Sequence, residues 1–111
     1  MTDFNTALGL VPGEDGSVVL DAGAAHEVAP DTVHFAVLAT LAEVAAARAV
    51  SAPVVPAAVS VQLLSRARPG RLVGRGRVLK RGRRLAFAEG EVTQEGELVA
   101  KATITFALLQ S

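Results

Sequence analysis

Glu43 is the residue of this sequence whose type and surroundings most clearly suggest chemistry. It lies in an apolar stretch with helical spacing, and its neighbours at i−4 and i+4 are Ala39 and Ala47. Arg48 is five residues on and lies on a different face, which leaves Thr40 as the polar neighbour within one turn. Burial of an unpartnered carboxylate is costly and raises its pKa toward neutrality. The pattern therefore indicates a general base or a nucleophile.

A structural role for Glu43 is the competing interpretation. Its side chain would then lie at the rim of the helix and contact water or an arginine from one of the strands. Composition and helical spacing alone do not decide between the two roles.

The basic residues are concentrated in one stretch, residues 66–84, which holds eight arginines, one lysine and no acidic residue. These nine are most of the eleven basic residues in a chain whose net charge is zero. Such a surface suits an anionic ligand, for example a nucleotide phosphate. The alternative is that long basic side chains only cover the solvent face of the strands that carry them.

The composition excludes several kinds of site. The chain has no cysteine, which removes disulfides, cysteine–zinc sites and thiol nucleophiles, and its two histidines are too few for a histidine-rich metal site. The N-terminal residues lack the basic stretch and apolar core of a signal peptide. The apolar segment around Glu43 is too short to span a membrane. We therefore expect a cytoplasmic protein without a metal.

The length of 111 residues allows one domain, which we expect to cover residues 1–111. The helix that carries Glu43 is preceded by a predicted helical turn, a strand and a loop that ends at Pro30, at residues 4–10, 17–21 and 22–30. Asp31 and Thr32 are typical N-cap residues, and they predict that the helix covers residues 34–50.

The chain after Pro53 has the alternation and the turns of an antiparallel meander. The four predicted strands cover residues 55–63, 72–80, 85–93 and 98–108. In the first of them the apolar residues at odd positions, Val55 to Leu63, are predicted to share one face, with Pro56, Ser60 and Gln62 on the other. In the last strand the even positions from Leu98 to Leu108 are apolar and predicted to face the core.

An antiparallel sheet has to bury one face, and the helix at residues 34–50 is the element available to cover it. That helix is apolar almost all round, which is typical of an enclosed helix. The predicted fold is therefore α+β, with one long central helix wrapped by a five-stranded antiparallel sheet.

The segment from His34 to Glu43 resembles the helix-start signature of the PaaI-type hotdog thioesterases, roughly H-G-G-x-x-x-T-L-x-D/E. His34, Thr40, Leu41 and Glu43 fall in register with it without a gap. The chain at 80–92 and 96–106 is similar to the last two strands of that family. The resemblance implies the hotdog fold and an acyl-CoA thioesterase that hydrolyses a CoA thioester to free acid and CoA.

In that family the site lies between two subunits, so the resemblance implies a homodimer or a dimer-of-dimers homotetramer. It assigns to Glu43 the role of nucleophile or general base, and to the backbone N–H of Phe35, just after His34, the polarisation of the thioester carbonyl. His34 and Glu43 are nine residues apart, about 13 Å along a helix and on opposite faces. They could reach one thioester only from different chains.

The resemblance also implies where the coenzyme A part of the substrate binds. Arg81, Arg83 and Arg84 flank a turn that lies near the CoA phosphates in the family. Arg66 and Arg68 are expected to contribute from the preceding turn. Coenzyme A enters as part of the substrate, and no separate cofactor is implied.

The sequence departs from the family at several positions. Phe35 and Ala36 replace Gly-Gly, which retains the backbone N–H but places a bulky ring near the thioester. Val28 stands where the family often has Asn or Gln, and Asp31 is expected either to substitute for it or to cap the helix. Ser60 is adjacent to a valine at the position where some relatives carry a polar residue. These departures predict a slow enzyme.

The main alternative is a non-hydrolytic acyl-CoA-binding hotdog module with a degenerate active site. Val28 and Phe35 favour it, whereas the in-register Glu43 argues against it. A nucleic-acid binder would explain the arginines, but the chain has no Trp or Tyr for base stacking and a net charge of zero. We therefore expect neither a nucleic acid nor a membrane as a partner.

Overall fold

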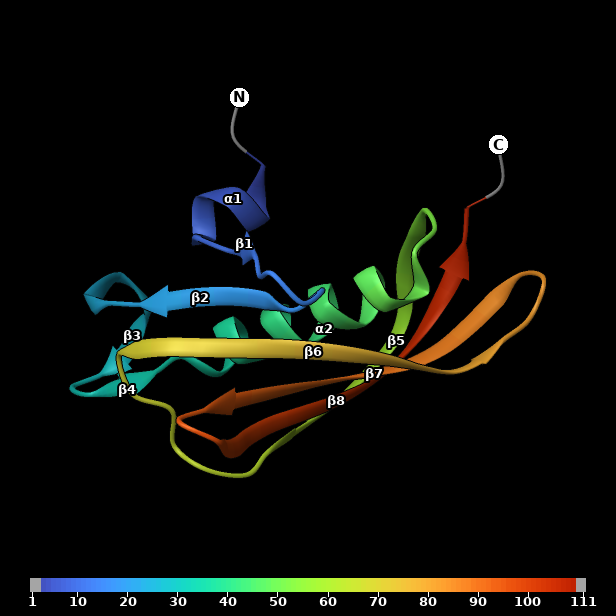
Figure 1. The fold of residues 1–111 in the computed structure, drawn as a ribbon. Helices are drawn as coiled ribbons and strands as arrows, with labels where there is room; N and C mark the ends of the chain where they lie inside the picture. The colour runs from blue at the N-terminus through green and yellow to red at the C-terminus, as the bar shows by residue number, and fades with distance from the viewer. Residues whose placement is uncertain (1–2, 110–111) are drawn as a thin grey trace.

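The computed structural model describes residues 3–109, in which one long helix packs against an antiparallel sheet (Figure 1). In chain order the elements are α1 (Phe4–Leu8), β1 (Val11–Pro12), β2 (Val18–Ala22), a 3-10 turn (Ala24–His26), β3 (Glu27–Ala29), β4 (Thr32–Val33), α2 (Phe35–Val50), β5 (Val54–Leu63), β6 (Gly70–Arg81), β7 (Leu85–Gln94) and β8 (Glu97–Leu108). The main sheet has the strand order β1-β2-β6-β7-β8-β5, and β3 and β4 form a separate pair.

The main sheet has six strands rather than the five predicted, because β1 adds a short strand at one edge. In β1, Val11 and Pro12 pair with Val19 and Val18 of β2. Two residues are too few to show alternation, and a proline in the sequence indicates a break rather than a strand. The prediction of a loop through Pro30 also missed β3, for the same reason of length.

The N-cap of α2 is His34, not Asp31 or Thr32 as predicted. The His34 Nδ1 accepts a hydrogen bond from the Ala36 backbone N–H at 2.9 Å. Asp31 instead turns the chain between β3 and β4 with a left-handed φ of 60°, and Thr32 belongs to β4. Asp31 was a reasonable cap by residue type, but β4 separates it from the helix, which begins at Phe35.

Small residues allow α2 to lie close to the sheet. A methyl group at Gly76 or Gly90 would overlap with the backbone carbonyls of Ala45 and Ala42, so the strands and the helix approach each other at backbone level. The helix residues buried here are Val37, Leu38, Leu41, Ala42, Ala45, Ala46 and Val50. Among residues 3–109 no helix has the length and hydrophobicity needed to cross a membrane.

The predicted alternation of β8 is confirmed for its central residues. Ala100, Ala102, Ile104 and Phe106 are all fully buried, and they face α2. These four side chains pack against α2 together with three buried residues of β7, Ala86, Ala88 and Val92. The core is therefore a layer between one helix and one face of the sheet.

In β5 the predicted alternation is right for one half of the strand and wrong for the other. Val59, Val61 and Leu63 pair with the core-facing residues of β8 and thus point to the helix side. A register shift just after Pro56 reverses the earlier positions, so Pro56 points to the helix side and Val55 to the outer side. A bulge cannot be read from the apolar pattern alone, because the residues on both sides of it are apolar.

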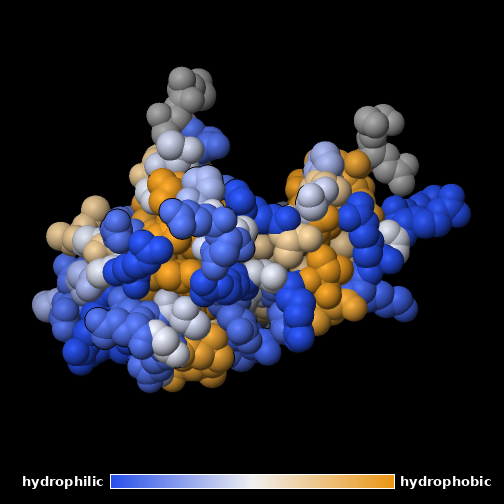
Figure 2. Space-filling view, viewed as in Figure 1, coloured by the Kyte–Doolittle hydropathy of each residue, from blue (hydrophilic) through white to orange (hydrophobic). Residues whose placement is uncertain are grey.

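β5 is a free edge of the sheet, and its apolar side chains are poorly covered. Val59 and Leu63 are 49% and 53% exposed although they lie on the helix side. Figure 2 shows hydrophobic surface over β5 and the end of β8. A long apolar edge strand of this kind is a ready partner for another strand.

Candidate active site

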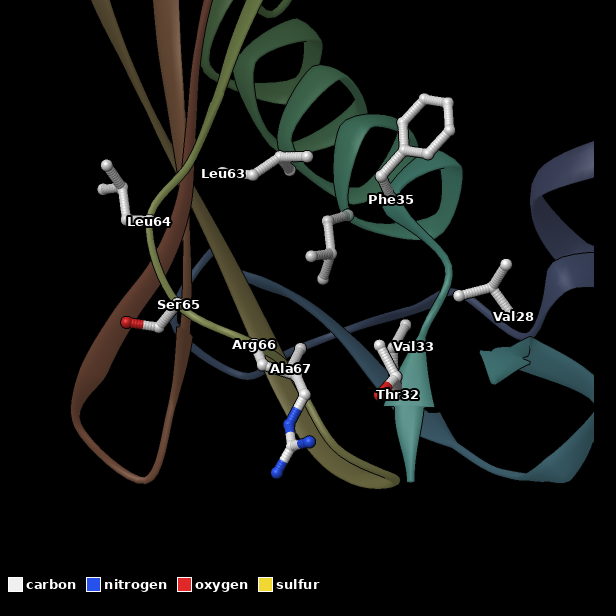
Figure 3. A pocket seen from close by; sticks show the side chains of 10 residues that line it. Val28, Thr32, Val33, Phe35, Leu63, Leu64, Ser65, Arg66 and Ala67 are labelled. Atoms are coloured by element: carbon white, nitrogen blue, oxygen red, sulfur yellow. The ribbon is translucent and has the colours of Figure 1, made fainter. Parts of the chain in front are cut away.

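A pocket of about 400 Å³ opens beside the first turn of α2, and we call it the helix-start pocket. Its lining is mostly apolar and comes from β3, β4, α2 and the segment after β5, with Val28, Val33, Phe35, Leu38, Leu63 and Arg66 among the residues. In Figure 3, Leu63 points toward α2, whereas the guanidinium of Arg66 extends away from Phe35. The pocket is thus apolar inside and carries a cation at one end.

Phe35, the first residue of α2, lines this pocket, and its backbone N–H has no acceptor among the residues that the structure describes. The next two N–H groups of the helix both bond to His34, that of Ala36 to Nδ1 at 2.9 Å and that of Val37 to the carbonyl oxygen at 3.0 Å. A free amide at the positive end of a helix attracts developing negative charge. The carbonyl oxygen of a thioester is a suitable acceptor for it.

His34 caps the start of α2 through its ring. Besides capping α2, its ring stacks on that of Phe35, with 4.7 Å between the ring centroids. The Phe35 side chain is 58% exposed, so its ring occupies space at the open edge of the pocket. The structure therefore shows His34 fixing the first turn of α2, next to the Phe35 amide.

Glu43 lines a second pocket of about 420 Å³, which we call the helix-end pocket. This pocket lies between α1, the C-terminal half of α2 and the start of β5, with Asn5, Ala47, Arg48 and Val54 also in its lining. Asn5 was not among the predicted site residues, and its position five residues into the sequence carries no motif that would have found it. Only the tertiary structure brings the Asn5 amide side chain to the same pocket as Glu43.

The Glu43 carboxylate is half-buried and makes neither a hydrogen bond nor an ion pair within residues 3–109. Burial raises its pKa above the ordinary value of a glutamic acid. Thr40, the neighbour within one turn, instead donates its hydroxyl to the Ala36 carbonyl oxygen at 2.8 Å. Such a carboxylate can accept a proton or attack an electrophile.

One chain does not bring Phe35 and Glu43 to the same place. They line different pockets, one at the first turn of α2 and the other along its C-terminal half, and eight residues, about 12 Å of helix, separate them. The helix-start pocket includes Leu63, the last residue of β5, whereas the helix-end pocket includes Val54, the first. A carbonyl held by one group is therefore out of reach of the other group in a single copy.

The predicted phosphate-binding arginines fall into two separate groups. Arg66 and Arg68 precede β6, and Arg81, Arg83 and Arg84 lie at its other end. The twelve residues of β6 span about 36 Å, so the two groups cannot bind one phosphate within a chain. Arg68 is 3.6 Å from Asp31, and Arg81 donates to the Val50 carbonyl oxygen at 2.8 Å, where it neutralises the C-terminal end of α2.

The solvent-face interpretation holds for the middle of the basic stretch. Arg75 forms an ion pair with Asp15 at 2.8 Å, and Arg77 pairs with Glu89 on the outer face of the sheet. Burial opposes ionisation of Glu89, but hydrogen bonds from Arg77 and Lys101 hold its pKa below the usual range. These residues form a cross-strand charge network.

The accessory polar residues are not brought to the pockets. Ser60 pairs with Thr103 on the outer side of the sheet, where it accepts a hydrogen bond from Gln62 at 3.1 Å. Asp31 turns away from the helix-start pocket into the ion pair with Arg68. Val28 does line this pocket, so an apolar side chain stands where a polar one was expected.

The family model described as the acyl-CoA thioesterase N-terminal domain matches residues 24–107. This chain therefore belongs to that family of acyl-CoA thioesterase domains. No curated protein matches the chain.

Solved structures with the same fold come from several bacteria. A conserved protein from Pseudomonas aeruginosa is 27% identical with a TM-score of 0.87, over 98% of this chain and 95% of that one. A phenylacetic acid degradation-related protein from Ralstonia eutropha is 28% identical with a TM-score of 0.84, over 94% and 88%. A mutant of the phenylacetic acid degradation protein PaaI from Thermus thermophilus is 31% identical with a TM-score of 0.83, over 96% and 98%. The predicted hotdog fold and the PaaI-type resemblance are both confirmed.

Proposed function

We propose that this chain is a subunit of an acyl-CoA thioesterase in which the Glu43 carboxylate does the chemistry. The observation that carries the proposal is the state of Glu43: it lines an open pocket, has no polar partner within residues 3–109 and has a raised pKa. Membership of the acyl-CoA thioesterase family supports the reaction, which is hydrolysis of a CoA thioester to free acid and CoA.

The free edge of β5 supports a dimer. This strand has ten residues, none of them charged, and nothing within the described chain pairs with its outer edge. The opposite edge of the sheet is β1, which has only two residues. Long, uncharged edges pair with other strands, and a second copy of the same strand is the partner that symmetry offers.

A two-fold axis perpendicular to the sheet would pair the two β5 strands antiparallel and keep both α2 helices on one side. The start of β5 in one copy then lies beside its end in the other. Because Val54 belongs to the helix-end pocket and Leu63 to the helix-start pocket, Glu43 of one copy comes next to the Phe35 amide of the other. The dimer thus joins the two half-sites that one chain keeps apart.

The chemistry follows from these two groups. The thioester carbonyl oxygen accepts a hydrogen bond from the Phe35 N–H, which stabilises the negative charge of the tetrahedral intermediate. Glu43 either takes a proton from the attacking water or attacks the carbonyl carbon itself, and water then hydrolyses the resulting anhydride. In both routes the C–S bond breaks, and the proton from water ends on the CoA thiolate.

A second candidate is an acyl-CoA-binding module without turnover. Val28 in the lining of the helix-start pocket favours it, because it supplies no polar group to the thioester. The exposed Phe35 ring at the edge of the pocket also favours it, because it takes up space there. The same two residues support slow turnover if the protein is an enzyme.

The test is hydrolysis of a panel of acyl-CoA thioesters by the wild type and by Glu43→Gln. The chain has no cysteine, so a thiol reagent reports only released CoA. We expect kcat/KM to fall by about a hundredfold or more in Glu43→Gln, since a general base contributes about 10²–10⁴ in rate. Glu14→Gln, which removes an exposed carboxylate remote from α2, is the matched control and should retain full activity.

Equal activity of Glu43→Gln and the wild type would exclude Glu43 as the catalytic group. Binding of CoA without hydrolysis of any thioester in the panel would favour the binding module instead.

A further inference from the structure

Asn5 brings a second polar side chain into the helix-end pocket, from α1 rather than from the helix that carries Glu43. The backbone carbonyl oxygen of Asn5 accepts from the N–H groups of Gly9 and Leu10 at 3.2 and 3.0 Å. Its side-chain amide, in contrast, makes no hydrogen bond among residues 3–109. This amide therefore retains its full capacity to bind a small polar molecule in the pocket.

Several contacts hold α1, and with it Asn5, in a fixed position. The Asp3 carboxylate caps the helix by accepting from the Thr6 N–H at 2.8 Å. Nδ1 of His26 accepts a backbone N–H, so Nε2 carries the proton and donates to the Leu8 carbonyl oxygen at 2.7 Å. The Leu8 side chain packs against the core. A helix of five residues is thus tied to the rest of the fold and can present Asn5 with constant geometry.

Hydrolysis of a thioester requires a water molecule with a lone pair directed at the thioester carbon. A carboxylate that acts as general base accepts one of the two protons of this water. A second acceptor that binds the other proton fixes the orientation of the water and leaves a lone pair for the attack. Glu43 can supply the first of these two acceptors but not the second.

Among the residues that line the helix-end pocket, Asn5 is the one that suits the second task. Four of the others are apolar, namely Val44, Ala47, Ala52 and Val54. The Arg48 guanidinium can only donate hydrogen bonds. The Ser51 hydroxyl can accept, but Ser51 follows Glu43 by eight residues, about 12 Å along the helix axis. The Asn5 Oδ1 is a neutral acceptor on a separate element.

We propose that Asn5 is a further catalytic residue, which holds the attacking water together with Glu43 of the same chain. The inference rests on the proposed function and selects its general-base route. The Asn5 Oδ1 accepts one water proton, and Glu43 removes the other as the water oxygen bonds to the thioester carbon. The C–S bond then breaks, and the proton passes from Glu43 to the CoA thiolate.

The first measurement is the steady-state kinetics of Asn5→Ala with the acyl-CoA thioester that the wild type hydrolyses fastest. We expect kcat to fall about tenfold, as for the loss of one hydrogen bond in the transition state. KM should change by less than about twofold, because Asn5 contacts the water and not the substrate. Asn5 is exposed and its side chain is unbonded within residues 3–109, so thermal unfolding should be unchanged. An unchanged kcat would overturn the proposal.

The decisive measurement is the pH dependence of kcat/KM for Asn5→Asp, which keeps an acceptor oxygen but adds a negative charge beside Glu43. A like charge within about 4–6 Å raises the pKa of a carboxylate. The ascending limb of the profile, which reports ionisation of the base, should therefore move to higher pH by about one unit. Above that limb, Asn5→Asp should recover the activity that Asn5→Ala loses.

Ala7→Asp is the matched control, because it adds the same charge to α1 at an exposed residue outside the lining of the pocket. Its profile should equal that of the wild type. A limb that moves equally in both variants, or in neither, would show that Asn5 does not act beside Glu43.

The outcomes also separate this inference from the proposed function. Loss of activity in Glu43→Gln, together with full activity in Asn5→Ala, removes Asn5 alone. Full activity in Glu43→Gln, or a wild type that hydrolyses none of the thioesters, removes both.

Discussion

Glu43 lowers the stability of the folded chain at neutral pH. A half-buried carboxylate without a hydrogen-bond donor is a net cost to folding at neutral pH, and in residues 3–109 nothing offsets it. Side chains that cost stability in this way are typical of functional sites. Ala39 and Ala47 predicted that Glu43 has no partner on its own helix, whereas only the folded chain shows that no strand within residues 3–109 supplies one.

The raised pKa of Glu43 predicts how stability changes with pH. Because the folded-state pKa lies above the unfolded value, the folded state binds the proton more tightly. Tighter proton binding by Glu43 stabilises the folded state fully at a pH below the unfolded-state pKa. This stabilisation is lost as the pH rises through the folded-state pKa. We therefore expect Glu43→Gln to unfold at a higher temperature than the wild type at pH 7–8, and this difference to shrink as the pH falls toward about 4.

Thermal unfolding at fixed protein concentration over this pH range would measure the effect, with Glu14→Gln as the control for loss of one charge. A Glu43→Gln protein that is less stable than the wild type at pH 8 would mean that the carboxylate has a stabilising partner in the assembled protein.

At the scale of single residues the sequence could not predict which side chains share a pocket. Phe35 was placed correctly at the start of the helix, because the signature and the helical spacing agree. Ser60 was placed correctly on the face opposite Val59, but that face is the outer side of the sheet and lies away from both pockets. Asn5 reaches the Glu43 pocket only through tertiary packing of α1. Contacts between remote segments leave no local pattern.

At the scale of elements, the meander and the long helix follow from local rules. Alternation from Ala100 to Phe106 of β8 and the apolar helix were both correct, because each pattern extends over many residues, whereas at the start of β8 a register shift buries Val99 in place of Leu98. The errors concern β1, β3 and β4, which have two or three residues each. Elements so short are held by their pairing partners rather than by their own sequence, so only the folded chain reveals them.

The close contact between α2 and the sheet gives a prediction about Gly90. Its added methyl group would overlap with the Ala42 carbonyl, which is backbone and cannot move without displacing the helix. We expect Gly90→Ala to lower the free energy of unfolding by about 2 kcal/mol or more, the upper part of the range for overpacking. Chemical denaturation at fixed protein concentration measures it.

Gly23→Ala is the matched control for that experiment. Gly23 has a negative φ, and a methyl group there would meet nothing within 4 Å. Its effect should stay within about 0.5 kcal/mol. Equal effects of the two substitutions would mean that the sheet glycines are not required for helix packing.

At the scale of the whole molecule, the edge formed by β5 decides the assembly. Val59 lies in the middle of this strand and is 49% exposed, so a two-fold axis through the strand centre brings the two copies of Val59 close together. We expect Val59→Lys to place like charges against each other and to yield a monomer at micromolar concentration. Light scattering measures the mass, and hydrolysis should be lost together with the dimer.

Val11→Lys provides the control from the opposite edge. Val11 is a comparably exposed valine, at 53%, but it belongs to the two-residue strand β1. This variant should remain dimeric and active. A Val59→Lys protein that stays dimeric would show that the interface lies elsewhere, and a monomeric wild type would exclude the shared site.

The position of Glu43 and the shape of the helix-start pocket depend on different sets of side chains. The position of Glu43 depends on buried glycines and alanines beneath the helix, where almost any larger residue would be rejected. Val28, Leu63 and Leu64 in the helix-start pocket are more than half exposed and contribute little to the core. Exchange of these three side chains can therefore reshape the helix-start pocket while the packing that holds the Glu43 carboxylate stays constant.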